Sequence, residues 1–172
     1  MTLYSVFSPS RSHYLSLAVF ALLFNAFALY LQYGEGLQPC VTCIDIRVGL
    51  WGVFVFSMLA SLKRSVSLLF AALSACCLFF SWYETHQSLN SLYSPTGFLS
   101  ACELRPAISE IIPIDDWLPA LFGVKGMCGK AFWSFAGLEL EVVKATFFAI
   151  SLLAGYHITA LFNGIISFFK GS

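Results

Sequence analysis

The residues of this 172-residue chain that are best suited to chemistry are its six cysteines, Cys40, Cys43, Cys76, Cys77, Cys102 and Cys128. Two of them form a Cys-x-x-Cys motif, Cys40-Val41-Thr42-Cys43, directly after Pro39. If a helix begins here, its unpaired N–H groups and the positive end of its macrodipole stabilise a thiolate over the thiol. The motif therefore predicts a reactive dithiol at the start of a helix.

Arg47 is the charged residue best placed to act with this dithiol. On a helix, Cys40, Cys43 and Arg47 share one face, whereas Asp45 lies off that face. An arginine costs about 2.5 to 3.5 kcal/mol at the centre of an apolar span and less near its end, so it needs a partner or a task. The alternative is that the side chain extends to the outer lipid headgroups.

The cysteines also allow other interpretations. Cys76 and Cys77 are adjacent in an apolar segment, where buried cysteine behaves as a small hydrophobic residue, so we assign them no redox role. A zinc site with four cysteine ligands usually has two tight pairs, and this sequence contains only one outside that segment. Structural disulfides remain an alternative, although a Cys-x-x-Cys at a helix start favours the thiolate and hence a labile disulfide.

The composition indicates the surroundings of these cysteines. Hydrophobic residues make up 59% of the chain and charged residues 10%, with nine basic and nine acidic side chains. Typical soluble proteins have roughly 45 to 50% apolar and about 25% charged residues. The balanced charge gives no indication of nucleic-acid binding, and an aromatic content of 17% excludes disorder. The sequence therefore predicts an integral membrane protein.

Four apolar segments have the length that a bilayer requires, about 17 to 25 residues. They cover residues 14–33, 44–62, 66–83 and 145–169. Hydrocarbon admits only helices or closed barrels, and barrel strands are about half this length, so all four should be helices. The predicted fold is all-α, a bundle of four transmembrane helices that forms a single membrane domain over residues 1–172.

Charge divides between the two ends of the predicted bundle. One end holds both termini and the turn between the second and third spans. Its charged residues are all basic: Arg11, Lys63, Arg64 and Lys170. Because Lys and Arg collect on cytoplasmic flanks, both termini should be cytoplasmic. The outer loops, 34–43 and 84–144, then place four cysteines where disulfides can form. The first span also resembles a secretory signal with an Ala26-Phe27-Ala28 cleavage site, but its apolar run is long and we expect it to remain.

The long outer loop holds too few apolar residues for a core of its own. Its first half should be irregular, because it contains Asn90, Ser91, Ser94, Pro95 and Gly97. Residues 115–122 combine an acidic start with an apolar cluster. That pattern predicts a short helix lying in the membrane interface.

Several of these motifs together carry a family resemblance from about residue 32 to residue 139. They are Gln32, Pro39 to Cys43 with Arg47, Tyr83-Glu84 followed by Leu92-Tyr93 and Cys102, and Asp116-Trp117-Leu118-Pro119 followed by Gly126, Cys128, Trp133 and Gly137-Leu138-Glu139. In this combination the sequence resembles the DsbB family of bacterial disulfide-bond-formation membrane proteins. The main departure is a loop that is a few residues longer between Tyr83 and Cys102.

The resemblance implies a redox relay in the bacterial inner membrane, coupled to quinone in the periplasmic oxidation system. A DsbA-like periplasmic protein with a thioredoxin fold would be oxidised by a Cys102–Cys128 disulfide, and Cys102 would form the mixed disulfide. Cys128 would then attack Cys40. The electrons would leave through Cys43 to a membrane quinone, either ubiquinone or menaquinone.

The resemblance also implies a quinone pocket. Arg47 would hold the anionic charge next to the quinone. Gln32, at the outer end of the first span, is a weaker candidate for the same pocket. His86 is weaker still, because the stretch from Tyr83 to His86 has an extra residue relative to the family pattern.

Two other classes of protein compete with this hypothesis. A thiol oxidoreductase resembling vitamin K epoxide reductase would share the quinone chemistry, but its Cys-x-x-Cys falls late in the sequence rather than at the second span. A non-enzymatic membrane scaffold with structural loop disulfides would have cysteines inert to dithiol reagents and no bound quinone. The sequence thus favours a quinone-dependent protein-disulfide oxidoreductase.

Overall fold

The computed structural model describes residues 11–36, 38–62, 67–93, 106, 109, 112–125 and 139–170. All regular structure in these residues is helical, and they contain no strand. Four long helices make up the bundle, α2 (Arg11–Gly34), α3 (Val41–Leu62), α4 (Ser67–Tyr93) and α8 (Glu139–Lys170). The all-α prediction is therefore confirmed for the described part of the chain.

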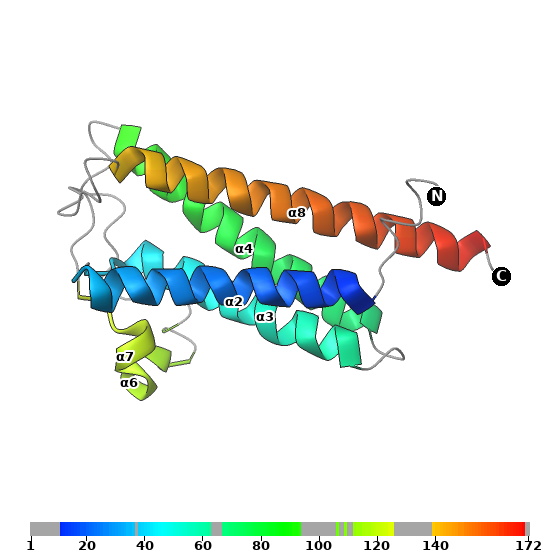
Figure 1. The fold of residues 1–172 in the computed structure, drawn as a ribbon, viewed down its shortest axis with the longest axis horizontal. Coiled ribbons are helices and arrows are strands. Elements are labelled where there is room, and N and C mark those ends of the chain that lie inside the picture. The colour runs from blue at the N-terminus through cyan, green and yellow to red at the C-terminus, as the bar shows by residue number, and fades with distance from the viewer. Residues whose placement is uncertain are drawn as a thin grey trace.

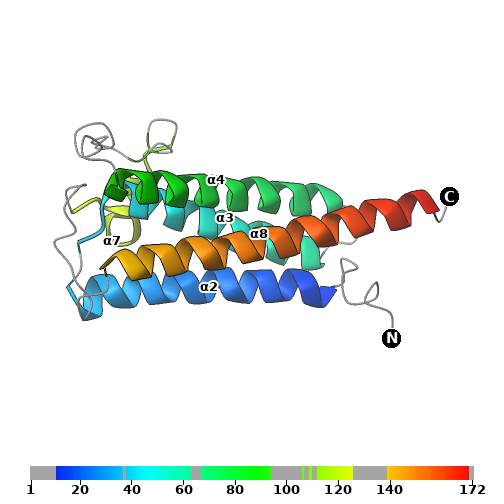
Figure 2. The ribbon, with the colours of Figure 1, turned by 90° about the horizontal axis from the view of Figure 1, so that it is seen from above.

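The four long helices lie alongside one another (Figures 1 and 2). Helix α3 packs against both α2 and α4, and α4 packs against α8. Within the described ranges, three helices are long and apolar enough to cross a membrane: Arg11–Gly34, Val41–Leu62 and Lys144–Asn163 of α8. Helix α2 begins, and α8 ends, at the same end of the bundle (Figure 1).

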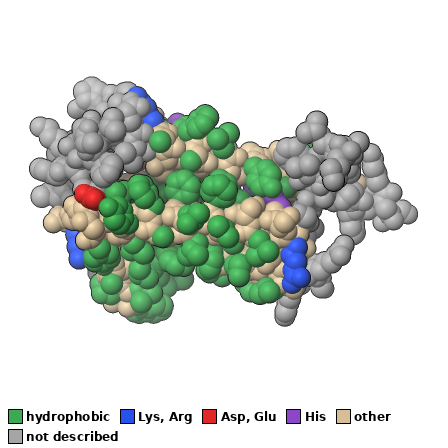
Figure 3. All heavy atoms as spheres, in the orientation of Figure 1, with side chains coloured by type: hydrophobic (Ala, Val, Ile, Leu, Met, Phe, Trp, Pro, Cys, Tyr) green, Lys and Arg blue, Asp and Glu red, His purple; other side chains and the backbone are tan. Residues whose placement is uncertain are grey.

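The bundle has an apolar exterior and an interior in which apolar residues are mixed with small and polar ones. Large apolar side chains are exposed along its length, among them Phe20, Leu23, Phe27, Leu69, Phe79, Phe148, Leu152 and Phe162. Figure 3 shows such side chains covering much of the described surface on one face. Each long helix contributes one residue to a buried cluster of Ala21, Val53, Leu78 and Ile150. This distribution fits a protein whose solvent is lipid.

Helices α3 and α4 approach closely because glycines of α3 face α4. A Cβ atom on Gly49 would collide with Ser81 Oγ, and one on Gly52 would lie 2.6 Å from Cys77 Sγ. The Ser81 hydroxyl lies 3.2 Å from two carbonyl oxygens to which it can donate, that of Ile46 in α3 and that of Cys77 in its own helix. Small residues and polar groups of this kind hold membrane helices together.

The helix boundaries differ from the prediction at α4 and α8. Helix α4 continues to Tyr93 instead of ending at residue 83, so Asn90 and Ser91 are helical and not irregular. Side-chain bonds between residues one turn apart, Gln87 to Tyr83 and Asn90 to His86, support the extension. Helix α8 begins at Glu139 rather than at residue 145. Hydropathy locates the apolar part of a helix but not its polar ends.

The predicted helix over residues 115–122 is split into two short helices, α6 (Ile114–Trp117) and α7 (Pro119–Phe122). Leu118 separates them, with φ −132° and ψ 62°. The break has a local cause, because proline disfavours the helical conformation in the residue before it. The prediction of helical structure was right, and the prediction of one continuous helix was wrong.

Candidate active site

The Cys-x-x-Cys motif begins helix α3, as its position after Pro39 predicts. The Ile44 N–H donates to the Cys40 carbonyl over 3.2 Å, so Cys40 is the N-terminal capping residue and Cys43 lies in the first turn. The Cys40 thiol lies 3.1 Å from Cys43 Sγ. Both side chains are half-buried. The two sulfurs are therefore within reach of each other at the positive end of the helix macrodipole.

Arg47 is buried one turn further along α3, with 4% of its surface exposed. Its Nη1 donates to Gln32 Oε1 over 2.7 Å and to the Leu121 carbonyl over 2.8 Å. Its Nη2 is 3.4 Å from the Ala28 carbonyl. The side chain thus has acceptors inside the protein, which contradicts the alternative that it extends to the headgroups.

The partners of Arg47 come from three elements. Ala28 and Gln32 belong to α2, and Leu121 belongs to α7. The guanidinium also interacts electrostatically with Cys43 and with Tyr33. The cation is therefore held beside the dithiol by neutral acceptors, which leave its charge available to a thiolate.

Two buried donors at this site have no acceptor among the described residues. They are Arg47 Nε and Gln32 Nε2. A buried donor without an acceptor costs about 1 to 3 kcal/mol, so native proteins rarely leave one in place without a ligand or water. Both groups are donors, so a ligand that satisfies them has to offer hydrogen-bond acceptors.

The α6–α7 segment lies beside the end of the bundle where α2 ends and α3 begins (Figure 1). The Tyr33 hydroxyl donates to the Ala120 carbonyl, and the Lys125 N–H donates to the Pro39 carbonyl over 3.1 Å. With the bond from Arg47 to Leu121, these contacts place the segment beside the dithiol. Phe122 is buried. By contrast, Trp117 is 68% exposed, and its apolar neighbours Ile112 and Leu118 are exposed too.

His86 lies in α4, apart from this network. Its ring stacks on Trp82 at 5.7 Å and lies 6.0 Å from the Phe147 ring, and its Nδ1 is 3.2 Å from Asn90 Nδ2. No hydrogen bond within the described residues joins it to Arg47 or to the dithiol. The structure therefore brings together Cys40, Cys43, Arg47 and Gln32, and does not bring His86 to them.

The remaining cysteines are two in α4 and two outside the described residues. Cys77 is half-buried against Gly52, and Cys76 is exposed on the apolar exterior. Cys102 and Cys128 lie outside the described residues. Their predicted pairing therefore stays a prediction.

Sequence reasoning missed three groups that position Arg47 or its neighbours: the Ala28 carbonyl, the Leu121 carbonyl and the Tyr33 hydroxyl. Backbone carbonyls leave no signal in a sequence. Tyr33 does follow Gln32 directly, but an aromatic residue at a helix end is also typical of the membrane interface.

Comparison with known proteins identifies the family. The chain matches the family described as "Disulfide bond formation protein DsbB" over residues 10–158. It is 33% identical over 150 residues to Disulfide bond formation protein B of Pectobacterium atrosepticum, covering 85% of this chain and 84% of the relative. The protein of the same name from Haemophilus influenzae is 34% identical over 143 residues, covering 81% and 80%. That from Pasteurella multocida is 34% identical over 158 residues, covering 89% and 87%. The chain belongs to the DsbB family of disulfide bond formation proteins.

Proposed function

We propose that this protein is a membrane thiol oxidase that sustains disulfide bond formation. It reoxidises a DsbA-like periplasmic protein with a thioredoxin fold and passes the electrons to a membrane quinone. Membership of the DsbB family supports this function. The Cys-x-x-Cys at the second long helix agrees with the family and not with the vitamin K epoxide reductase alternative.

One observation in the structure carries the proposal. Cys40 and Cys43 have their sulfurs 3.1 Å apart at the start of α3, with the buried Arg47 one turn away. A fixed cation in low dielectric stabilises an adjacent thiolate far more than it would in water. Arg47 therefore favours the Cys43 thiolate, which is the form that reacts.

The unpartnered donors fit a quinone. Arg47 Nε and Gln32 Nε2 are both buried donors, and a quinone offers carbonyl oxygens as acceptors. Donors fixed in place before the reaction stabilise negative charge as it develops. A bound quinone would supply the two-electron oxidation of the Cys40–Cys43 dithiol. Arg47 and Gln32 are the residues that we propose hold it, and His86 has less support because it lies outside their network.

The α7 segment adds shielding from water. It lies beside the end of the bundle where α2 ends and α3 begins, with Phe122 buried and the Leu121 carbonyl bonded to Arg47. Exclusion of water strengthens the interaction between Arg47 and a thiolate, because the local dielectric falls. We propose that α7 serves as the cover of the dithiol.

The other two cysteines would link this site to the partner. A thiolate of the partner would attack Cys102, forming a mixed disulfide and releasing the Cys128 thiolate. Cys128 would attack Cys40 of an oxidised Cys40–Cys43 pair, releasing the Cys43 thiolate. The partner's second thiolate would attack the partner sulfur of the mixed disulfide and release the Cys102 thiolate, and Cys102 would attack Cys128 and release the Cys40 thiolate. Each step breaks one S–S bond and forms another, and the partner leaves oxidised while Cys40 and Cys43 are left reduced.

The proposed setting is the bacterial inner membrane. Three helices meet the length and hydropathy needed to cross it, and we propose α4, with 27 residues, as the fourth span. The whole chain, residues 1–172, would then form one membrane domain with both termini in the cytoplasm. The dithiol end of the bundle would face the periplasm.

The decisive experiment follows quinone absorbance. The purified full chain is mixed with a quinone and a reduced thioredoxin-like protein, and quinone reduction is recorded. The wild type and Cys76→Ser should turn over at equal rates, whereas Cys43→Ser should be inactive. A wild type without quinone reduction, or an active Cys43→Ser variant, would overturn the proposal.

A further inference from the structure

Two of the three histidines of the chain are buried inside the bundle, at the end where α2 begins and α8 ends. His13 of α2 is 3% exposed and His157 of α8 is 0% exposed. An ionisable side chain inside a membrane bundle is expensive, so it implies a partner and a task. Neither histidine belongs to the site around Cys40 and Cys43.

The two imidazoles form an oriented chain of hydrogen bonds. His157 Nε2 is 3.1 Å from the Ala71 carbonyl of α4, and a carbonyl only accepts, so Nε2 carries the proton. In a neutral ring, His157 Nδ1 is then an acceptor. His13 Nε2 lies 3.0 Å from that Nδ1 and must be the donor. The chain thus runs from α2 through α8 to α4.

The surroundings of the pair are aromatic, polar and basic. The rings of Tyr14 and Tyr156 lie 5.4 Å and 4.5 Å from His13, and Tyr14 also contacts His157. Arg11, two residues before His13, donates from Nε to the Ser61 carbonyl of α3. The other basic residues of this end are Lys63 and Arg64, which lie outside the described residues, and Lys170, the last residue of α8.

The helix segments that carry and surround the pair contain no acidic side chain. In sequence, no Asp or Glu occurs in residues 1–34, 46–83 or 142–172. These ranges include α2, the later part of α3, the α4 residues around Ala71 and the part of α8 around His157. A charge buried without a counter-charge costs far more than a buried neutral group. The hydrogen-bonded pair therefore holds best when both rings are neutral.

We propose that His13 and His157 form an acid-sensitive latch that joins α2, α4 and α8 while both rings are neutral. Uptake of protons from the side where α2 begins opens the latch. Two protons would set two N–H groups and two like charges against each other across the 3.0 Å contact. This inference does not depend on the redox function.

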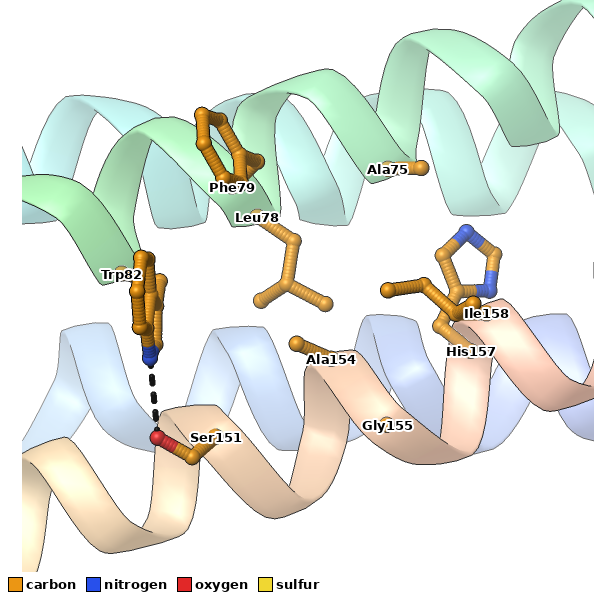
Figure 4. Close-up of a pocket in the computed structure, with 9 residues that line it drawn as sticks. All are labelled: Ala75, Leu78, Phe79, Trp82, Ser151, Ala154, Gly155, His157 and Ile158. Carbon is orange, nitrogen blue, oxygen red and sulfur yellow. Dashed lines mark hydrogen bonds between the residues drawn. The ribbon is translucent and has the colours of Figure 1, made fainter.

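The fold leaves room for the latch to open. A groove of about 300 Å³ lies between α4 and α8, and His157 lines one end of it. Figure 4 shows His157 projecting from α8 toward α4, beside Ile158 and above Gly155. A Cβ atom on Gly155 would meet nothing within 4 Å. We expect that a released His157 imidazole would turn into this groove, which it already lines.

The tautomers provide a direct test. Nitrogen NMR of the full chain in detergent micelles, with isotope-labelled histidine, reports three rings, which single histidine-to-glutamine variants assign. His13 and His157 should both be neutral and carry the proton on Nε2 near neutral pH. A charged ring at either position, or a proton on His157 Nδ1, would overturn the proposal.

Thermal unfolding provides the second test. In the unfolded chain both imidazoles are in water and take up protons near pH 6.5, whereas the closed, neutral pair takes up none. Unfolding therefore binds protons, and the free energy of unfolding should decrease as the pH is lowered. The wild type and the matched control His86→Gln should lose about 3 °C or more per pH unit below about pH 6.5. The His13→Gln/His157→Gln variant should lose clearly less. An identical slope in all three proteins would contradict the latch, and the tautomer measurement stands even if the double variant does not fold.

Discussion

Arg47 is a buried cation whose direct hydrogen-bond acceptors carry no formal charge. Gln32 Oε1 and the Leu121 carbonyl fix its position, and neither neutralises it. A carboxylate in their place would hold the side chain equally well but would compete with a thiolate for its charge. The choice of neutral acceptors therefore suits a residue whose charge is needed at Cys43.

Replacing Arg47 with methionine should slow quinone reduction about tenfold or more, because a charge-assisted interaction contributes about 1.5 to 3 kcal/mol. Arg47→Lys should recover part of the rate, since lysine restores the charge but not the planar set of donors. Stopped-flow absorbance measures the quinone step. Single-turnover oxidation of the partner is the control and should change little in both variants. Equal quinone kinetics in all three proteins would remove Arg47 from the proposed mechanism.

Cys102 is the proposed point of attack by the partner. A thioredoxin-like protein without its resolving cysteine should be trapped as a mixed disulfide with the chain, because no second thiol releases it. Cys102→Ser should abolish the trapped species, and Cys128→Ser should retain it. Non-reducing electrophoresis measures both. An adduct that persists in Cys102→Ser would mean that another cysteine is attacked first.

The elements that hold the site depend on close contact between helices. Helix α3 carries both Cys43 and Arg47, and its glycines allow α4 to approach to the point where Ser81 reaches the Ile46 carbonyl. This contact explains the position of Cys77, whose sulfur packs at Gly52. Cys77 therefore packs as a small apolar residue between α3 and α4, in agreement with the role that its apolar surroundings predicted.

Gly49→Ala should lower the free energy of unfolding by about 1 to 3 kcal/mol, because the new methyl group collides with Ser81 Oγ and nears the Cys77 carbonyl. Gly155→Ala is the matched control, since its Cβ meets nothing and alanine favours a helix by up to about 1 kcal/mol. Thermal unfolding in micelles compares the two. Adding Ser81→Ala to Gly49→Ala should recover part of the loss. Equal stability of the two single variants would contradict the close contact.

Tyr33 fastens α7 to α2. Tyr33→Phe removes the donor to the Ala120 carbonyl, and a lost hydrogen bond of about 0.5 to 1.5 kcal/mol should raise local opening about two- to tenfold. Tyr30→Phe is the control, because Tyr30 donates only to the nearby Glu35 side chain. Hydrogen exchange of residues 119–125 measures the opening. Unchanged exchange in Tyr33→Phe would show that Arg47 and Lys125 hold the segment without it.

Hydropathy and motif spacing predicted much of this arrangement, for identifiable reasons. The helical state of the apolar segments follows from length and composition, and the position of the dithiol follows from Pro39 and the Cys-x-x-Cys motif. The polar extension of α4 to Tyr93 escaped prediction because hydropathy does not register it. Pro119 is a sequence signal for the helix break at Leu118, but the apolar cluster around it favoured the prediction of one continuous helix.

In the molecule as a whole, the buried polar groups with a proposed role lie at the two opposite ends of the bundle. The dithiol, Arg47 and the α7 segment lie at one end, and the His13–His157 pair lies at the other. Helix α2 joins them, because it carries His13 near its start and Gln32 near its end. Sequence reasoning predicted Gln32 near the dithiol but gave no role to His13 or His157, since their contact joins residues 144 positions apart.

The orientation of the molecule is the last prediction, and it follows from the charges at those two ends. Basic residues alone flank the end where α2 begins, so this end should face the cytoplasm and the dithiol end the periplasm. An impermeant thiol reagent applied to reduced spheroplasts should therefore label Cys102 and Cys128. Cys76 and Cys77 should stay unlabelled, because they lie midway along α4 among apolar residues, where a charged reagent does not enter. Inverted vesicles are the matched control, and their intact membranes should protect all four positions. If Cys102 and Cys128 were labelled only in inverted vesicles, the true orientation would be the reverse of the predicted one. The reactive dithiol would then lie in a reducing compartment, where the proposed oxidase could not sustain disulfides.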